Sequence, residues 1–172
     1  GAGAWSYANG TVLADGFYTF QVTGSDGGSD TLGLTIAAEE PPPSGATEGP
    51  DLLIGTEGDD TISGLGGDDT INGLGGDDIL NGNGGNDLIN GGSGNDTLNG
   101  DEGNDTIYGG DGEDVINGGT DNDYLNGDAG NDTINGGSGS DVISGGDGAD
   151  VINGDSGADT INAGTGNDTV NG

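Results

Sequence analysis

A large aliphatic residue recurs at every ninth position through the C-terminal two-thirds of the chain, and the residues between are mostly glycine, asparagine, aspartate and threonine. From residue 55 to residue 171 this spacing divides the chain into thirteen nine-residue units without an insertion or deletion. The aliphatic holds the eighth position of each unit and of a partial unit at residues 49–54: Leu53, Ile62, Ile71, Leu80, Ile89, Leu98, Ile107, Ile116, Leu125, Ile134, Ile143, Ile152, Ile161 and Val170. A constant period of this kind predicts a solenoid of stacked, similar coils.

An aspartate holds the sixth position of every unit, always two residues before the aliphatic. The series is Asp51, Asp60, Asp69, Asp78, Asp87, Asp96, Asp105, Asp114, Asp123, Asp132, Asp141, Asp150, Asp159 and Asp168. Glycine holds the first position except at Ala163 and the fourth except at Asp121. Glycine permits positive φ, so carbonyls can converge in a turn, and carboxylate and carbonyl oxygens are the ligands that Ca²⁺ prefers. The pattern predicts calcium sites at the turns, with strain at Asp121 and local loosening at Ala163, beside Asp168.

The unit G-G-x-G-x-D-x-U-x, with U a large aliphatic, resembles the repeats-in-toxin (RTX, hemolysin-type) calcium-binding family over about 70% of the chain. The resemblance implies an all-β fold, a right-handed parallel β-roll (β-helix) of nonapeptide repeats. It also implies that each ion takes two stacked sixth-position carboxylates, with carbonyls from the second and fourth positions below and the first and third above. Carried onto this chain, one such site consists of Gly92, Gly94, Asp96, Gly109, Asp111 and Asp114.

Two units are expected to form one coil of 18 residues, so units of the same parity stack. Each unit is expected to consist of a six-residue turn and a three-residue strand, in which the eighth residue alone points inward. Stacked aspartates would lie ~4.8 Å apart and repel each other by roughly 1 kcal/mol in water. A calcium ion between them reverses the sign of this interaction. Pairs 18 residues apart run from Asp51/Asp69 to Asp150/Asp168, which gives up to twelve sites.

Residues 1–38 carry most of the aromatic residues and a hairpin signal at Asn9-Gly10. Two alternating segments follow the hairpin, at residues 17–23 and 31–36. This region resembles the last strands of a bacterial cadherin-like or immunoglobulin-like module, and it predicts a partial antiparallel β-sandwich. Its open edge leaves homotypic pairing with a second chain as one alternative. Residues 39–48 form an acidic, proline-rich linker, and residues 49–172 form the β-roll.

The charge is one-sided, with 32 acidic residues and no lysine, arginine or histidine. This composition excludes nucleic-acid binding and anionic membrane surfaces by the usual electrostatic route. It is typical of a disordered chain, so we expect folding to depend on cations that neutralise it. Because the chain also lacks cysteine, the groups on which most catalysis depends are missing, and we expect no enzymatic site. The absence of an initial methionine and of a signal peptide predicts a piece of a longer protein.

We expect a calcium-gated folding module of a secreted or cell-surface bacterial protein, such as an adhesin, an S-layer component or a filament subunit. The alternative is the secretion and folding module of an RTX toxin or secreted hydrolase. A third hypothesis is ice binding by an outward array of asparagines with neighbouring threonines. We favour a structural role for that array, in which asparagine amides hydrogen-bond along the stack. Its members are Asn81, Asn99, Asn117, Asn135, Asn153 and Asn171.

Overall fold

The computed structural model describes residues 17–18, 36–37 and 45–172. The chain divides into two compact units, Gly1–Pro41 and Pro42–Gly172. In the first unit, β1 (Phe17–Tyr18) pairs with β2 (Ile36–Ala37) in antiparallel register. The rest of the predicted sandwich, its immunoglobulin-like resemblance and residues 39–44 of the predicted linker lie outside the described residues.

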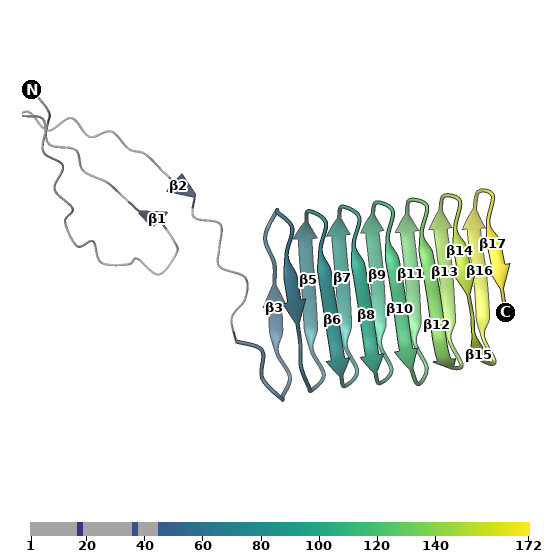
Figure 1. Cartoon of the computed structure of the whole chain (residues 1–172), viewed down its shortest axis with the longest axis horizontal. Coiled ribbons are helices and arrows are strands. Elements are labelled where there is room, and N and C mark those ends of the chain that lie inside the picture. Colours follow the sequence, from purple (N-terminus) through teal and green to yellow (C-terminus); the bar gives the residue numbers. More distant parts are fainter. Residues whose placement is uncertain (1–16, 19–35, 38–44) are drawn as a thin grey trace, which may run out of the picture. The chain divides into compact units, whose positions relative to one another are not determined.

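The second unit is a parallel β-roll with two sheets, in which successive strands alternate from one sheet to the other, except that β14 and β15 share a sheet (Figure 1). One sheet contains β3 (Leu52–Ile54), β5 (Thr70–Gly75), β7 (Leu88–Ser93), β9 (Thr106–Asp111), β11 (Tyr124–Ala129), β13 (Val142–Asp147) and β16 (Thr160–Thr165). The other contains β4 (Thr61–Ser63), β6 (Ile79–Gly84), β8 (Thr97–Glu102), β10 (Val115–Thr120), β12 (Thr133–Gly139), β14 (Val151–Asn153), β15 (Ser156–Gly157) and β17 (Thr169–Asn171). Ile116 lies opposite Ile134 in the register, which confirms the coil of 18 residues.

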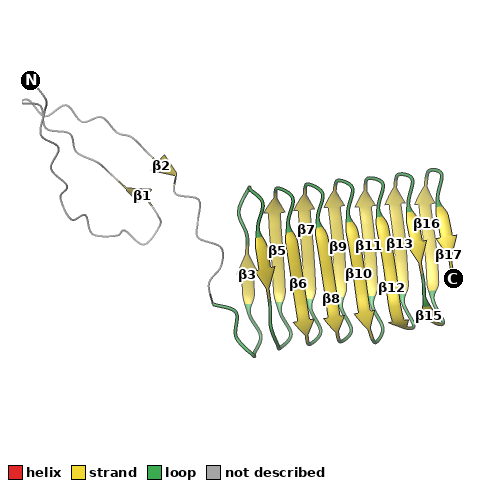
Figure 2. Cartoon of the chain, in the orientation of Figure 1, coloured by secondary structure: helices red, strands yellow, loops and turns green. Residues whose placement is uncertain are grey.

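Most strands are longer than the predicted three residues. Strands β5 to β13 each span six or seven residues, so the first three positions of the following unit continue the strand (Figure 2). The backbone hydrogen bonds explain this difference, because third-position N–H groups still pair with the coil before. Gly75 N–H donates to Thr56 O at 3.2 Å, and Gly84 N–H donates to Leu65 O at 3.1 Å. The turns are therefore confined to positions four to six.

The core between the sheets is one aliphatic side chain from each unit. Twelve of the fourteen eighth-position residues, Leu53 to Ile152, are at most 4% exposed. Positions seven and nine face outward, as predicted from strand alternation. The expectation that the aliphatic alone points inward was wrong, because the sixth-position aspartates from Asp69 to Asp150 are at most 3% exposed. Their side chains are enclosed by the turns, where each Oδ2 atom lies beside the first-position glycine of its own unit.

The asparagine array runs along the outside of the sheet that contains β8, β10 and β12. Asn117 Nδ2 donates to Asn99 Oδ1 at 2.8 Å, and Asn135 Nδ2 donates to Asn117 Oδ1 at 2.9 Å. The same bond recurs from Asn99 to Asn81 and onward to Asn171 at 2.7–2.9 Å. The predicted ladder is confirmed, and each amide extends the backbone hydrogen-bond network from one coil to the next. Among the described residues, no helix is long and apolar enough to cross a bilayer.

Candidate metal centre

The sixth-position aspartates form two columns in which each residue is hydrogen-bonded to the aspartate one coil later. The N–H of Asp96 donates to Oδ1 of Asp114 at 2.8 Å. The same bond joins all twelve predicted pairs at 2.8–3.1 Å: 51/69, 60/78, 69/87, 78/96, 87/105, 96/114, 105/123, 114/132, 123/141, 132/150, 141/159 and 150/168. One carboxylate oxygen of each upper aspartate is thus fixed by the backbone of the lower turn.

The second carboxylate oxygen has no partner in most of these aspartates. Oδ2 is buried without a hydrogen bond in Asp69, Asp78, Asp87, Asp96, Asp105, Asp114, Asp123, Asp132, Asp141 and Asp150. A buried carboxylate oxygen without a donor costs several kcal/mol unless a cation or a proton reaches it. Ten such atoms in register indicate that the turns are built for a positive charge.

A backbone carbonyl oxygen lies beside each orphaned carboxylate oxygen. Asp96 Oδ2 and the carbonyl oxygen of Gly109 both crowd the point where a Cβ of Gly91 would stand, the carbonyl at 2.6 Å. Neither an ionised carboxylate nor a carbonyl can donate a hydrogen, so the two oxygens need a cation, or a proton on the carboxyl group, between them. The first position is glycine because any side chain would fill this space. Ala163 holds this first position beside Asp168, and the predicted loosening there stays a prediction.

The carbonyls of facing turns point toward one another. The carbonyl oxygens of Gly92 and Gly94 are the atoms nearest to the Cβ sites of Gly110 and Gly112 in the coil after. Asp111 O points back toward the earlier coil, where it accepts from Gly94 N–H at 2.8 Å. Both lower carbonyls require left-handed turns, with φ of 110° at Gly92 and 132° at Gly94. The six groups expected to form one site therefore lie on two facing turns, and their role as ligands stays a prediction.

Asp121, which replaces a fourth-position glycine, adopts the geometry of the glycines. Its φ is 74°, inside the left-handed region that aspartate tolerates better than most residues. Its carbonyl oxygen is the atom nearest to the Cβ site of Gly139 in the next coil. The turn of Asp123 and Asp141 therefore presents the same carbonyl as its neighbours, and the expected strain is limited to one residue at positive φ.

Burial makes these carboxyl groups weak acids. Desolvation raises the pKa of Asp114 to about 7, against the lowering effect of the hydrogen bond from Asp96 N–H, and the charges of Asp132 and Asp96 raise it further. The pKa of Asp123 is raised to about 7 by the same main cause. Desolvation raises the pKa of Asp78, Asp105 and Asp132 to about 6. A carboxylate whose charge is costly to bury gains more from a bound divalent cation than a solvated carboxylate does.

The donor set fits a hard cation of large coordination number. Every group expected to bind the ion is a carboxylate or carbonyl oxygen. Ca²⁺ takes about six to eight oxygens in flexible geometry. Within residues 45–172, no three acidic side chains converge into a metal cluster by themselves. A metal in these turns must therefore use backbone carbonyls as well as the paired aspartates. This is the composition of a calcium site, and it fits the ion that the repeat pattern implies.

Sequence reasoning missed the hydrogen bonds that the fifth-position side chains make. Asp59, Asp68 and Asp77 are exposed. Asp59 Oδ1 accepts from Asp77 N–H at 2.9 Å, and Asp77 Oδ1 accepts from Asn95 N–H at 2.8 Å. Asp68 accepts from Asn86 N–H at 2.8 Å. The frequent asparagine or aspartate at this position was the available signal, because both residues readily accept bonds from backbone N–H groups.

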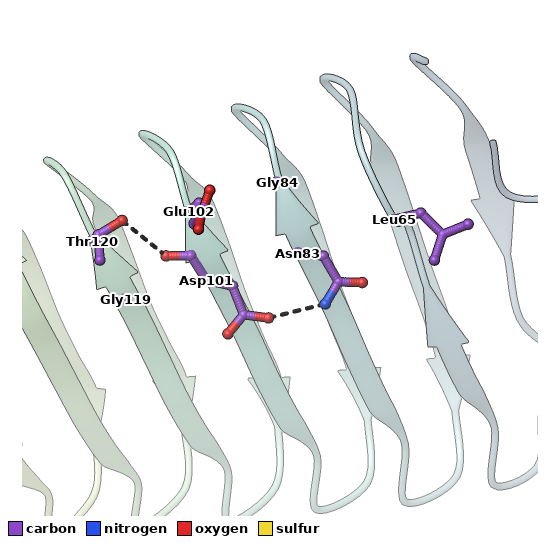
Figure 3. A pocket seen from close by; sticks show the side chains of 7 residues that line it. All are labelled: Leu65, Asn83, Gly84, Asp101, Glu102, Gly119 and Thr120. Carbon is purple, nitrogen blue, oxygen red and sulfur yellow. Dashed lines mark hydrogen bonds between the residues drawn. The ribbon is translucent and has the colours of Figure 1, made fainter. Parts of the chain in front are cut away.

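A shallow surface groove of about 680 Å³ is the main alternative to the aspartate columns (Figure 3). It lies over the ends of β6, β8 and β10, and three of its polar residues, Asn83, Asp101 and Thr120, are already hydrogen-bonded. Asn83 Nδ2 donates to Asp101 Oδ2 at 3.1 Å, and the Thr120 hydroxyl donates to Asp101 O at 3.4 Å. Its acids are solvated, whereas the columns hold buried atoms without partners. The columns are therefore the candidate site.

Comparison with known families identifies the same repeats. The family model described as the RTX calcium-binding nonapeptide repeat matches the chain in four copies, at residues 45–80, 73–107, 108–143 and 135–170. These matches cover the whole described β-roll except its last two residues. No curated protein gives a significant match to the chain.

Proposed function

Because the chain belongs to the RTX calcium-binding nonapeptide repeat family and is a calcium-binding repeat module, we propose that this module is a calcium-gated folding switch. Its parent is a secreted or cell-surface bacterial protein of structural or adhesive type, such as an adhesin, an S-layer component or a filament subunit. The proposal gives residues 49–172 a metal-binding and structural role and no catalytic one.

The observation that carries the proposal is the set of ten buried Oδ2 atoms without a partner. The ligands would be the two aspartates of a pair, the second- and fourth-position carbonyls below them, and the first- and third-position carbonyls above. When bound, the ion supplies the positive charge that offsets the repulsion and desolvation of the carboxylates. The thin aliphatic core cannot offset these costs alone, so binding free energy becomes folding free energy.

The calcium gradient across a bacterial envelope makes this switch useful. Extracellular calcium modules bind with dissociation constants of about 10⁻⁴–10⁻³ M. At cytosolic concentrations far below this range the aspartates repel and the chain stays extended, in a form that can pass through a channel. Outside the cell, mass action favours the folded roll. This supports export before folding and an extracellular site of action.

The decisive experiment is a calcium titration of the full chain, followed by circular dichroism and isothermal calorimetry. We expect a coil-like spectrum in chelator and a cooperative gain of β signal in millimolar Ca²⁺. Mg²⁺ at the same concentration should fail, because it requires small octahedral sites and releases its water reluctantly. A metal-free chain that kept the β spectrum at neutral pH would refute the proposed switch.

The parental role needs a separate test in the producing bacterium. If the roll supports an adhesive or surface protein, deletion of residues 49–172 should release the parent from the surface or abolish cell attachment, with export intact. If the roll is the secretion module of a toxin or hydrolase, the same deletion should leave the parent inside the cell. Fractionation and immunoblotting distinguish these two outcomes.

A further inference from the structure

Two threonines in the first coil hydrogen-bond to the sixth-position aspartates, and no later coil has such a threonine. Thr56 N–H donates to Asp60 Oδ2 at 2.6 Å, and the Thr56 hydroxyl lies 3.0 Å from the same oxygen. Thr47 makes the same two contacts with Asp51 Oδ2, at 2.6 Å and 3.0 Å. The Oδ2 atoms of Asp51 and Asp60 therefore have donors, whereas the Oδ2 atoms of the following ten aspartates have none.

The threonine hydroxyls also contact the fourth-position carbonyls of their turns. Thr56 Oγ1 lies 3.3 Å from Gly58 O, and Thr47 Oγ1 lies 3.2 Å from Gly49 O. In the later coils the fourth-position carbonyl oxygen is the atom nearest to the Cβ site one coil on, as Gly76 O is for Gly94. For Gly49 and Gly58 the nearest atoms are instead the carbonyl carbon, Cα and the next nitrogen. One expected ligand therefore does not face the coil above.

Backbone conformation explains why threonine produces this change. The second position has positive φ in the later turns, even where it is leucine, with φ of 78° at both Leu65 and Leu74. Thr47 and Thr56 are absent from the described residues with positive φ. A β-branched residue pays a high steric cost at positive φ. The turn instead directs the threonine N–H and hydroxyl toward the carboxylate.

We infer that the first coil, residues 46–63, takes no calcium, because Thr47 and Thr56 satisfy the carboxylate and carbonyl oxygens that an ion would bind. The chain then holds ten ions, one for each pair from Asp69/Asp87 to Asp150/Asp168, and not the twelve that the repeat spacing allows. The first coil is a metal-independent cap on the N-terminal end of the roll. This inference rests on the proposed function, since it concerns which aspartate pairs bind calcium.

The core is closed at the same end. Leu53 and Ile62, the first aliphatics of the two ladders, are 4% and 3% exposed, and Ala46 packs against the core cluster to which they belong. A cap that needs no ion offers the aspartates of the next coil backbone donors. Asp51 and Asp60 donate their N–H groups to Oδ1 of Asp69 and Asp78 at 2.8 Å. The first calcium-dependent turns are thus oriented before their ions bind.

The test is a count of bound ions by native mass spectrometry of the full chain at saturating Ca²⁺. We expect ten ions in the wild-type chain and ten in D51N/D60N, because those carboxylates are not ligands. The matched variant D96N/D105N should lose about four, since each of its aspartates belongs to two pairs. T47G/T56G restores glycine at the second position and should gain up to two ions. T47S/T56S keeps both hydroxyls and should hold ten.

The outcomes distinguish the metal-independent cap from the calcium switch. A wild-type chain with twelve ions, of which D51N/D60N loses two, would overturn the cap and leave the calcium switch intact. A chain that binds no calcium would refute both. A count that stays at ten in T47G/T56G would show that the threonines do not exclude the ion. If T47G/T56G fails to fold, the ion counts of the wild type and D51N/D60N still decide whether the first coil binds calcium.

Discussion

The N–H of Asp96 donates to Oδ1 of Asp114 at 2.8 Å, across 18 residues of sequence and from one coil to the next. This bond holds the upper carboxylate with its other oxygen turned into the turn, where Oδ2 has no donor. The backbone thus aligns the aspartates, and their charge opposes that alignment. Metal-free and metal-bound stability should therefore respond in opposite directions when one of these charges is removed.

D114N tests this opposition directly. Asn keeps an oxygen for the Asp96 N–H, and its amide nitrogen would stand near the carbonyl oxygen of Gly127, which crowds the same point as Asp114 Oδ2. We expect D114N to lose two bound ions and to fold at a higher calcium concentration. In chelator, the same variant should populate more β structure than the wild type, because a buried charge has been replaced by a hydrogen-bonded neutral group.

E113Q is the matched control, since it removes one charge from the neighbouring, exposed residue. Glu113 Oε1 accepts from Asn131 Nδ2 at 3.1 Å, and glutamine retains that acceptor. We expect the ion count and the calcium midpoint of E113Q to equal those of the wild type. If calorimetry showed that D114N and E113Q lose the same number of bound ions, the loss would reflect the overall charge of the chain and not a specific site.

The first-position glycine should be intolerant of a methyl group. A Cβ at Gly91 would lie 2.6 Å from Gly109 O and closer still to Asp96 Oδ2, so the G91A variant must displace ligands of the proposed site. We expect G91A to lower stability in calcium by about 2–4 kcal/mol, the range for overpacking with disrupted polar contacts. Urea unfolding at fixed Ca²⁺ measures this loss.

G84A is the corresponding control on the surface groove. A Cβ at Gly84 would meet nothing closer than Leu65 O at 3.8 Å, and the backbone there has no positive φ. Its unfolding midpoint should stay within about 0.5 kcal/mol of the wild type. Equal destabilisation by G84A and G91A would indicate that glycine is needed for the strand and not for the turn interior.

The repeat spacing was sufficient to predict which residues stack. An aliphatic and an aspartate every nine residues define the register of Ile116 with Ile134 and of Asp96 with Asp114, and both were found. The ladder of Asn117 with its neighbours followed from the same arithmetic. Periodicity succeeds here because a parallel coil places equivalent residues one strand spacing apart.

Spacing did not predict where side chains point within a turn. The burial of Asp96 and the backbone bond accepted by Asp59 depend on the turn's φ angles, which a repeat pattern does not give. The strands were also predicted too short, since Gly75 and Gly84 continue ladders that glycine usually weakens. Thr56 replaces the second-position glycine of the repeat unit. That its hydroxyl contacts Asp60 Oδ2 becomes visible only in the structure.

Acid should partly replace calcium in the metal-free chain. The folded-state pKa is raised to about 7 for Asp114 and Asp123, above the ordinary value of 3.8. Between these values the folded chain binds more protons than the unfolded chain, so its stability rises as pH falls. This gain in stability is complete below the pKa of the carboxyl group in the unfolded chain. It is lost as pH rises through the pKa of the same group in the folded chain.

Circular dichroism in chelator should show β signal that grows from pH 7 to pH 4. Calcium affinity should fall over the same window, because protons compete for the same oxygens. D114N/D123N offers a control, because it lacks two of the most strongly shifted groups and should show a weaker dependence near pH 7. A metal-free spectrum that stayed constant from pH 8 to pH 4 would contradict the role assigned to buried charge.

The asparagine ladder should stabilise the roll in proportion to the bonds that each member makes. Asn117 donates at 2.8 Å and accepts at 2.9 Å, whereas Asn90 on the other sheet makes one bond, at 3.5 Å to Asn72 Oδ1. N117A leaves Oδ1 of Asn99 without its donor and Nδ2 of Asn135 without its acceptor, and it should cost about 1–2 kcal/mol in calcium. N90A should cost about 0.5 kcal/mol or less, since one long bond contributes little.

Because neither asparagine belongs to the aspartate columns, both variants should keep the wild-type ion count, which separates coil stability from metal binding. Equal unfolding midpoints for N117A and N90A would contradict a structural ladder and would reopen a surface-binding role for the array.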